Sequence, residues 1–185
     1  MHEIEPHYNW RNFYQAEEDP RSPFFNKEYS EIYFSHQIYN HVIHPQWDDF
    51  GSPSLYMKLL YTNYEHAFCV IELMGEWNDC INNDIMHFKR NIIEHLHGYG
   101  IENFVIIGEN ILDFHAGDLD YYEEWQDEIE GFIYLVNLRF HVQDEMDRYG
   151  VSDYFLNGGK FNQVNWRTHH PLRLFDALNQ GNLLK

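Results

Sequence analysis

The stretch Phe104-Val105-Ile106-Ile107 decides how this 185-residue chain folds, because it offers no polar side chain to water. A strand in a half-exposed sheet alternates apolar and polar residues, whereas an unbroken apolar run is typical of a strand covered on both faces. Residues 132–138 form a second, largely apolar run. We therefore predict two buried strands, at residues 104–107 and 132–138.

Upstream of these runs lies a predicted hairpin. Residues 55–61 alternate in the manner of a half-buried strand, and residues 67–74 indicate a second, more buried strand. Residues 63–66 have the composition of a turn between them. The sequence Gly-Glu-Trp-Asn at residues 75–78 is expected to end the second strand.

Two amphipathic helices are predicted between and after the buried strands. Asp79 is a suitable N-cap for the first helix, and Gly98 ends it. The second helix is acidic, and Gly131 closes it. Apolar residues at helical spacing form a buried stripe on each helix: Ile81, Ile85, Phe88, Ile92 and Leu96 on the first, and Leu119, Tyr122, Trp125 and Ile129 on the second. Shorter helices are expected at residues 142–149 and 172–178.

This element order predicts the fold class. Strands separated by single helices pair in parallel through right-handed crossovers. We expect an α/β domain with a mixed sheet, in which an N-terminal hairpin is followed by β-α-β-α-β crossovers. Residues 51–150 form this core, and residues 151–185 form a tail with a short helix. Residues 1–50 form an aromatic-rich extension of the same domain, with short strands near residues 32–34 and 38–43.

Composition limits the partners. The formal net charge is −18, so phosphate backbones and anionic membranes repel the surface, and we expect neither nucleic-acid nor membrane binding. The same surface does not repel a basic partner protein or a cationic ligand. The many rings of the extension are expected to cover a sheet face of their own chain or to pack on a second copy.

The two cysteines, Cys69 and Cys80, have no CxxC neighbour, which indicates neither a disulfide framework nor a zinc ribbon. The first six residues contain no basic region and no apolar run, as a signal peptide would require. No stretch approaches the ~20 apolar residues of a membrane span. These features predict a cytoplasmic protein.

Residues 55–150 resemble the STAS domain, the fold of sulfate transporters and anti-sigma-factor antagonists, in their order of elements. Gly75 follows the second strand, where that family often has glycine, and residues 113–117, Asp-Phe-His-Ala-Gly, are similar to its Asp-Ser-Ser-Gly turn. Phe114 or His115 would occupy the position of the phosphorylated Ser or Thr. The resemblance therefore implies a fold and a protein-binding role without a phosphorylation switch.

The richest cluster of polar residues follows the third strand, where open α/β sheets bind ligands. Asp113, His115 and Asp118, with Asp120 nearby, could hold a divalent cation through oxygen and imidazole ligands, and such a metal could activate water. Acidic residues that could assist from neighbouring strand ends are Glu72, Glu76 and Glu109. The alternative is structural, since Asp118 is also a natural N-cap and Asp120 suits the first turn of a helix.

We predict from these features a non-catalytic regulatory or protein-interaction domain that binds a protein partner or a second copy of itself. No organic cofactor is expected. A metal-assisted hydrolase centred on Asp113, His115 and Asp118 is the first alternative. A small-molecule binding module is the second, and an apolar cavity between the aromatic extension and the sheet would be its signature.

Overall fold

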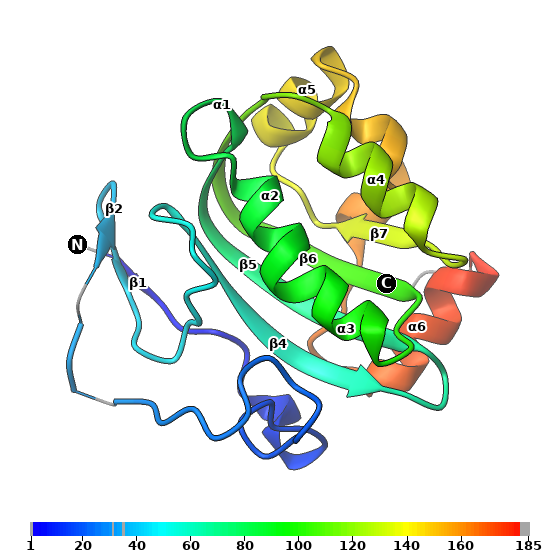
Figure 1. Cartoon of the computed structure of the whole chain (residues 1–185). Helices are drawn as coiled ribbons and strands as arrows, with labels where there is room; N and C mark the ends of the chain where they lie inside the picture. The colour runs from blue at the N-terminus through cyan, green and yellow to red at the C-terminus, as the bar shows by residue number, and fades with distance from the viewer. Residues whose placement is uncertain (1, 31, 35, 182–185) are drawn as a thin grey trace.

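A four-stranded mixed sheet forms the centre of the molecule (Figure 1). The computed structural model describes residues 2–30, 32–34 and 36–181. The strand order is β4(Leu55–Asn63), β5(Phe68–Asn78), β6(Asn103–His115) and β7(Ile133–Val136). The β4–β5 pair is antiparallel, and the other two pairs are parallel. The predicted fold class, a hairpin followed by β-α-β-α-β crossovers, is confirmed.

The helices between β5 and β6 cover one face of this sheet, and in Figure 1 they lie in front of it. Between β5 and β6 the chain forms α1(Asp79–Asn82), α2(Asp84–Phe88), a π-helical turn (Lys89–Ile93) and α3(Glu94–Gly98). The remaining helices are α4(Asp120–Glu128), α5(Phe140–Arg148) and α6(Pro171–Gln180). No helix in the described part of the chain has the length and the apolar character needed to cross a membrane.

The β6 strand is buried on both faces, as its apolar run predicts. Phe104 and Ile106 belong to the core under the helices, whereas Val105 and Ile107 belong to a second core on the opposite face. All four side chains are fully buried. Alternate side chains of a strand point to opposite faces, so an unbroken apolar run needs cover on both sides.

Two strands are longer than predicted. The expected break at residues 75–78 is wrong, because β5 continues through Gly75 to Asn78. Gly75 has φ of +123°, and a Cβ atom there would lie 2.2 Å from the Ser54 carbonyl oxygen, so the strand passes this point only with glycine. The β6 strand likewise runs on to His115, which places Asp113 and His115 within a strand and not in the predicted turn after it.

The first helical region differs from the prediction at its start. Asn78, not Asp79, is the N-cap, and its side chain accepts a hydrogen bond from the Ile81 amide. Asn83 adopts φ of +52° and ends α1 after one turn. Ile81 is consequently 80% exposed and leaves the predicted stripe. The rest of that stripe, from Ile85 onward, is buried as predicted.

The acidic helix α4 buries Tyr122 and Trp125, as predicted. Leu119 occupies its N-cap position without a side-chain hydrogen bond, so the N-cap role considered for Asp118 is wrong. The two shorter helices expected near the C-terminus are present as α5 and α6.

The N-terminal extension folds onto β4. Its strands β1(His2–Ile4), β2(Gln37–Ile38) and β3(His41–Ile43) form a small sheet, and Asn9–Asn12 form a 3₁₀ turn. The strand predicted at residues 32–34 is absent from the described residues there, whose side chains are exposed. Together with α6 and the tail before it, the extension covers the second face of the sheet. The β4 strand is therefore buried on both faces and not on one.

Candidate functional site

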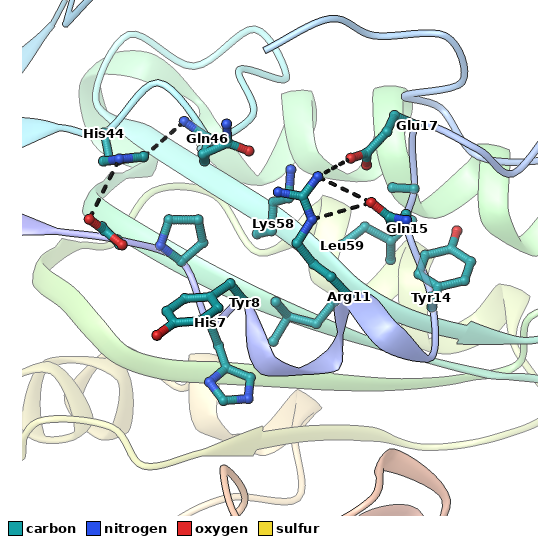
Figure 2. Close-up of a pocket in the computed structure, with 14 residues that line it drawn as sticks. His7, Tyr8, Arg11, Tyr14, Gln15, Glu17, His44, Gln46, Lys58 and Leu59 are labelled. Atoms are coloured by element: carbon teal, nitrogen blue, oxygen red, sulfur yellow. Dashed lines mark hydrogen bonds and ion pairs between the residues drawn. The ribbon is translucent and has the colours of Figure 1, made fainter. Parts of the chain in front are cut away.

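A cavity of about 450 Å³ lies between the N-terminal extension and β4 (Figure 2). Most of its lining comes from residues 5–17 of the extension and residues 58–60 of β4. Apolar and aromatic lining is provided by Pro6, Tyr8, Tyr14 and Leu60, and charged lining by Arg11, Glu17 and Lys58. An apolar cavity at this place is the signature given above for a small-molecule binding module. The structure has a cavity here, with charged groups as well as apolar ones.

Lys58 reaches this cavity because of the alternation of β4. Met57 and Leu59 point into the core under the helices, so Lys58 points to the opposite face. A backbone bridge pairs Asp48 with Met57, with hydrogen bonds of 2.7 and 3.0 Å. This bridge holds the Asp48 side chain next to the Lys58 amine, with Asp48 Oδ2 at 3.4 Å from Lys58 Nζ.

The Asp48 carboxylate is fully buried and has closer partners than Lys58. Lys27 Nζ lies 2.8 Å from Asp48 Oδ1, and the Tyr29 hydroxyl donates a 2.6 Å hydrogen bond to the same oxygen. Two ammonium groups therefore face one carboxylate. Burial beside this charge raises the pKa of Tyr29 well above its usual range, which keeps the phenol protonated as a donor.

Lys58 itself is only 9% exposed. No acceptor among the described residues meets hydrogen-bond geometry with its amine, which instead lies 3.8 Å from the centre of the Tyr29 ring. Burial lowers the pKa of Lys58, and the nearby Asp48 and Glu17 carboxylates oppose this only in part. A lysine amine carries three donors, and those of Lys58 are buried inside the wall without a hydrogen-bond partner among the described residues.

The other charged groups of the lining are paired. Arg11 Nη2 donates to Glu17 Oε1 at 2.8 Å and to Gln15 Oε1 at 3.1 Å. His44 Nδ1 accepts a hydrogen bond of 3.1 Å from the Gln46 amide, and its Nε2 lies 3.8 Å from Glu5. Figure 2 shows these pairs around the cavity.

A second buried polar cluster adjoins the cavity through His7. Lys58 pairs in register with Glu72 on β5, whose carboxylate is fully buried. Glu72 accepts hydrogen bonds from the His7 amide at 2.9 Å and from Asn110 Nδ2 at 3.0 Å. Arg167 Nη2 lies 3.7 Å away. Burial raises the pKa of Glu72 to about 7 against the opposing effects of these partners.

This cluster attaches both ends of the chain to the sheet. Arg167 of the tail forms an ion pair with Glu109 of β6, and Trp166 Nε1 donates to Glu109 at 3.3 Å. The His7 ring packs edge-on against Trp10 and Trp166, at centroid distances of 5.4 and 4.8 Å. Burial, assisted by the Arg167 charge, lowers the pKa of His7 to about 4, so its ring is neutral at pH 7.

The predicted metal residues lie at the far end of β5 and β6. Asp113 Oδ2 and Glu76 Oε1 are 3.7 and 3.4 Å from His115 Nε2. Asp118 lies outside the strand and joins neither of the described groups of three or more possible ligands whose atoms lie within 4.8 Å of one another. These groups are Glu3, Glu5 and His44, and Glu94, Glu124 and Glu128. The metal at Asp113, His115 and Asp118 stays a prediction, and so does the hydrolase built on it.

The three glutamates that could assist the predicted metal residues from neighbouring strand ends lie in two separate places. Glu72 and Glu109 belong to the buried cluster beneath the chain ends. Glu76 lies beside His115, where the Tyr39 hydroxyl donates to it at 2.6 Å. Burial disfavours the Glu76 charge, yet hydrogen bonds from Tyr39 and Asn78 outweigh it and lower the pKa of Glu76.

Neither Lys58 nor Asp48 was predicted from the sequence to belong to a site. The only signal for Lys58 is a charged residue in a strand whose second face was expected to meet water. Asp48 lies in an irregular segment, and only its bridge to Met57 brings it to the cavity.

No protein-family model matches the chain, and no curated protein sequence matches it. Its structure is similar to that of the anti-sigma factor antagonist SpoIIAA in its unphosphorylated form, with a TM-score of 0.48 and 12% identity. The similarity covers 67% of this chain and 96% of that chain. A protein partner for this chain stays a prediction, since identity this low concerns the fold alone. The order of its helices and strands gives the chain a mixed α/β fold.

Proposed function

We propose that this protein is a regulatory domain that binds a small molecule in the cavity between its N-terminal extension and β4. The observation that carries the proposal is the cavity itself. Its volume of about 450 Å³ lies within the range of small-molecule sites, roughly 300–1,000 Å³. Such sites combine apolar walls with a few convergent polar groups, as Leu60, Tyr14 and Lys58 do here.

The cavity walls come from segments far apart in the sequence, which suits a regulatory role. Tyr14 and Lys58 are 44 positions apart, yet both contribute to the lining. A ligand between them would hold the extension against β4 and stabilise the native state by mass action. Ligand binding would then change how firmly the extension covers the sheet, which is a signal that a partner protein could detect.

The test is a screen of a small-molecule library against the isotopically labelled full-length protein, followed by amide shifts in two-dimensional NMR spectra. Gln46→Trp places a large ring at the lining and is expected to abolish binding. Gln126→Trp makes the same change on the exposed side of α4 and should leave binding intact. The proposal would be wrong if no compound shifts amides of residues 5–17 or 58–60 saturably, or if Gln46→Trp leaves binding unchanged.

A further inference from the structure

We propose that the ligand of this cavity is a short uncharged peptide, which binds in an extended conformation as an added strand along the free edge of β4. This inference rests on the proposed function and narrows its small molecule to one class. It is carried by main-chain groups of β4 that have no partner, by the course of the chain before Asp48 and by the charge balance of the lining.

The free edge of β4 begins beyond its bridge with Asp48. Met57 exchanges two hydrogen bonds with Asp48, so the N–H and C=O of Met57 point away from β5. The register between β4 and β5 is regular from Met57 to Leu59, and main-chain groups alternate in direction along an antiparallel strand. The N–H and C=O of Leu59 therefore also point away from β5. No hydrogen bond from another segment of the described chain reaches either group.

These two groups of Leu59 belong to the cavity wall. The Leu59 side chain packs into the core under the helices, and yet Leu59 lines the cavity, so its main chain forms this part of the wall. Residues 15–17 of the extension line the cavity beside it, but no main-chain hydrogen bond joins these described residues to β4. The extension thus encloses the strand edge without pairing with it. An open strand edge can pair with a further extended chain.

The chain itself leaves this edge just before Asp48. Asp48 pairs antiparallel with β4, so a continued strand would bring Gln46 opposite Leu59. The chain turns instead between His44 and Trp47, where the Trp47 amide donates to the His44 carbonyl oxygen at 3.0 Å. The Gln46 amide donates to His44 Nδ1. Gln46 and Leu59 both line the cavity (Figure 2), so a peptide residue there would take the position that a continued strand would fill.

The charges around the cavity balance, which favours an uncharged main chain over an ion. Arg11 and Glu17 form an ion pair at 2.8 Å. Glu5 on the lining offsets the positive charge that Asp48 leaves uncompensated on Lys58 and its neighbouring lysine. In strand addition, main-chain hydrogen bonds give the affinity and pockets for side chains give the specificity.

The first experiment needs no variant. Isothermal titration of the full-length protein tests tripeptides of Ala, Leu, Phe and Gln that are N-acetylated and C-amidated, so that they carry no charge. We expect at least one to bind. Replacing one of its amide groups by an ester should weaken it by about tenfold, because that N–H donates to the Leu59 carbonyl oxygen. An ester at the next amide should have little effect, since successive N–H groups of a strand point in opposite directions. Equal effects of the two esters would overturn the inference.

Hydrogen exchange then locates the bonds. In the free protein the Leu59 amide should exchange at least roughly tenfold faster than the Lys58 amide, which points at β5. A saturating tripeptide should slow exchange at Leu59 and leave Lys58 unchanged. A Leu59 amide as protected as that of Lys58 in the free protein would overturn the inference, and so would a Leu59 exchange rate that the bound tripeptide does not change.

The outcomes separate this inference from the proposed function. If Gln46→Trp abolishes binding of a non-peptide compound, and no tripeptide binds, the cavity is a binding site and the peptide assignment is wrong. If tripeptides bind but Gln46→Trp does not affect them, both the site and its ligand class are wrong. Binding of a tripeptide that Gln46→Trp abolishes, that Gln126→Trp leaves intact and that protects the Leu59 amide would support both.

Discussion

Lys58 and Lys89 are both buried lysines, and they belong to opposite sides of the sheet. Lys89 lies among the helices, with Glu128, Glu94 and Glu124 oxygens at 2.8, 3.0 and 3.3 Å from its amine. Burial disfavours its charge, but the hydrogen bonds that its amine donates to these carboxylates outweigh that effect and raise the pKa of Lys89. Lys58 has one carboxylate at 3.4 Å and a lowered pKa.

The difference reflects what covers each face. Helices α1 to α5 cover one face, and charged residues there form ion pairs between neighbouring helices, as Lys89 does with Glu124 and Glu128 of α4. The N-terminal extension and the tail with α6 cover the other face, and the extension leaves a cavity and an incompletely paired cation. The same residue type is therefore fully paired on one side of the sheet and poorly compensated on the other.

We expect the largest effect on stability when two fully buried tryptophans, one on each face of the sheet, are replaced and compared. Trp125→Ala should lower the free energy of unfolding by about 3–5 kcal/mol, because Trp125 packs between Phe88 and Phe104 in the helix-covered core. Trp166→Ala should cost less, since the chain ends around it can relax into the space. Urea denaturation measures both, and equal losses would show that the two faces are equally rigid.

Replacement of Glu72 tests whether the carboxylate in the polar cluster is buried and titrates, because the stability of the protein then depends on pH. Its pKa is raised from 4.5 to about 7, so the folded state binds the proton more tightly than the unfolded state. The ionisation of this carboxyl group therefore leaves the free energy of unfolding unchanged below about pH 4.5 and lowers it increasingly as the pH rises to about 7. Glu72→Gln should stabilise the protein by on the order of 3 kcal/mol at pH 8, and by little at pH 4.5.

The control for this prediction is the exposed Glu130→Gln, which should show no such dependence on pH. The lowered pKa of His7 gives the opposite slope in the wild type, because stability is lost as pH falls from 6.5 toward 4. The difference between Glu72→Gln and wild type at each pH removes that contribution. A difference that stays constant from pH 4.5 to 8 would contradict a buried, titrating Glu72.

The smallest effects are expected at the two lysines themselves. Lys89→Met leaves three carboxylates facing one another without their cation and should destabilise the fold by about 1–3 kcal/mol. Lys58→Met should change stability by less than about 1 kcal/mol, because it removes a charge that is poorly compensated. Thermal and urea denaturation of both variants measure the contrast. A reversed order would mean that Lys58 is the structural cation.

Much of the sheet could be predicted from periodicity. The apolar run from Phe104 to Ile107 and the helical stripe from Ile85 to Leu96 gave the strands, the crossovers and one packed face. Predictions failed where local signals compete with tertiary contacts. Gly75 was expected to end a strand that in fact continues, and Asp79 was expected to be a cap but is buried, where it accepts hydrogen bonds from Trp77, Tyr122 and the Ile85 amide.

The candidate site could be anticipated only in outline. The rings of the extension indicated that it covers a sheet face or packs on a second copy, and a cavity beneath it was named only as the signature of a small-molecule binding module. Lys58, Asp48 and Glu72 were not assigned to that site, because their partners come from distant segments. Asp113, His115 and Asp118 are close in sequence, and yet the extension of β6 to His115 leaves Asp118 beyond the strand end.

The sequence by itself determined the sheet, its strand directions and the face under the helices, because local periodicity records which side of each element avoids water. Only the tertiary structure decided what the second face became. An irregular extension has no period from which its register on β4 could be read, so the cavity and the burial of Lys58 arise only once residues 5–17 meet residues 58–60.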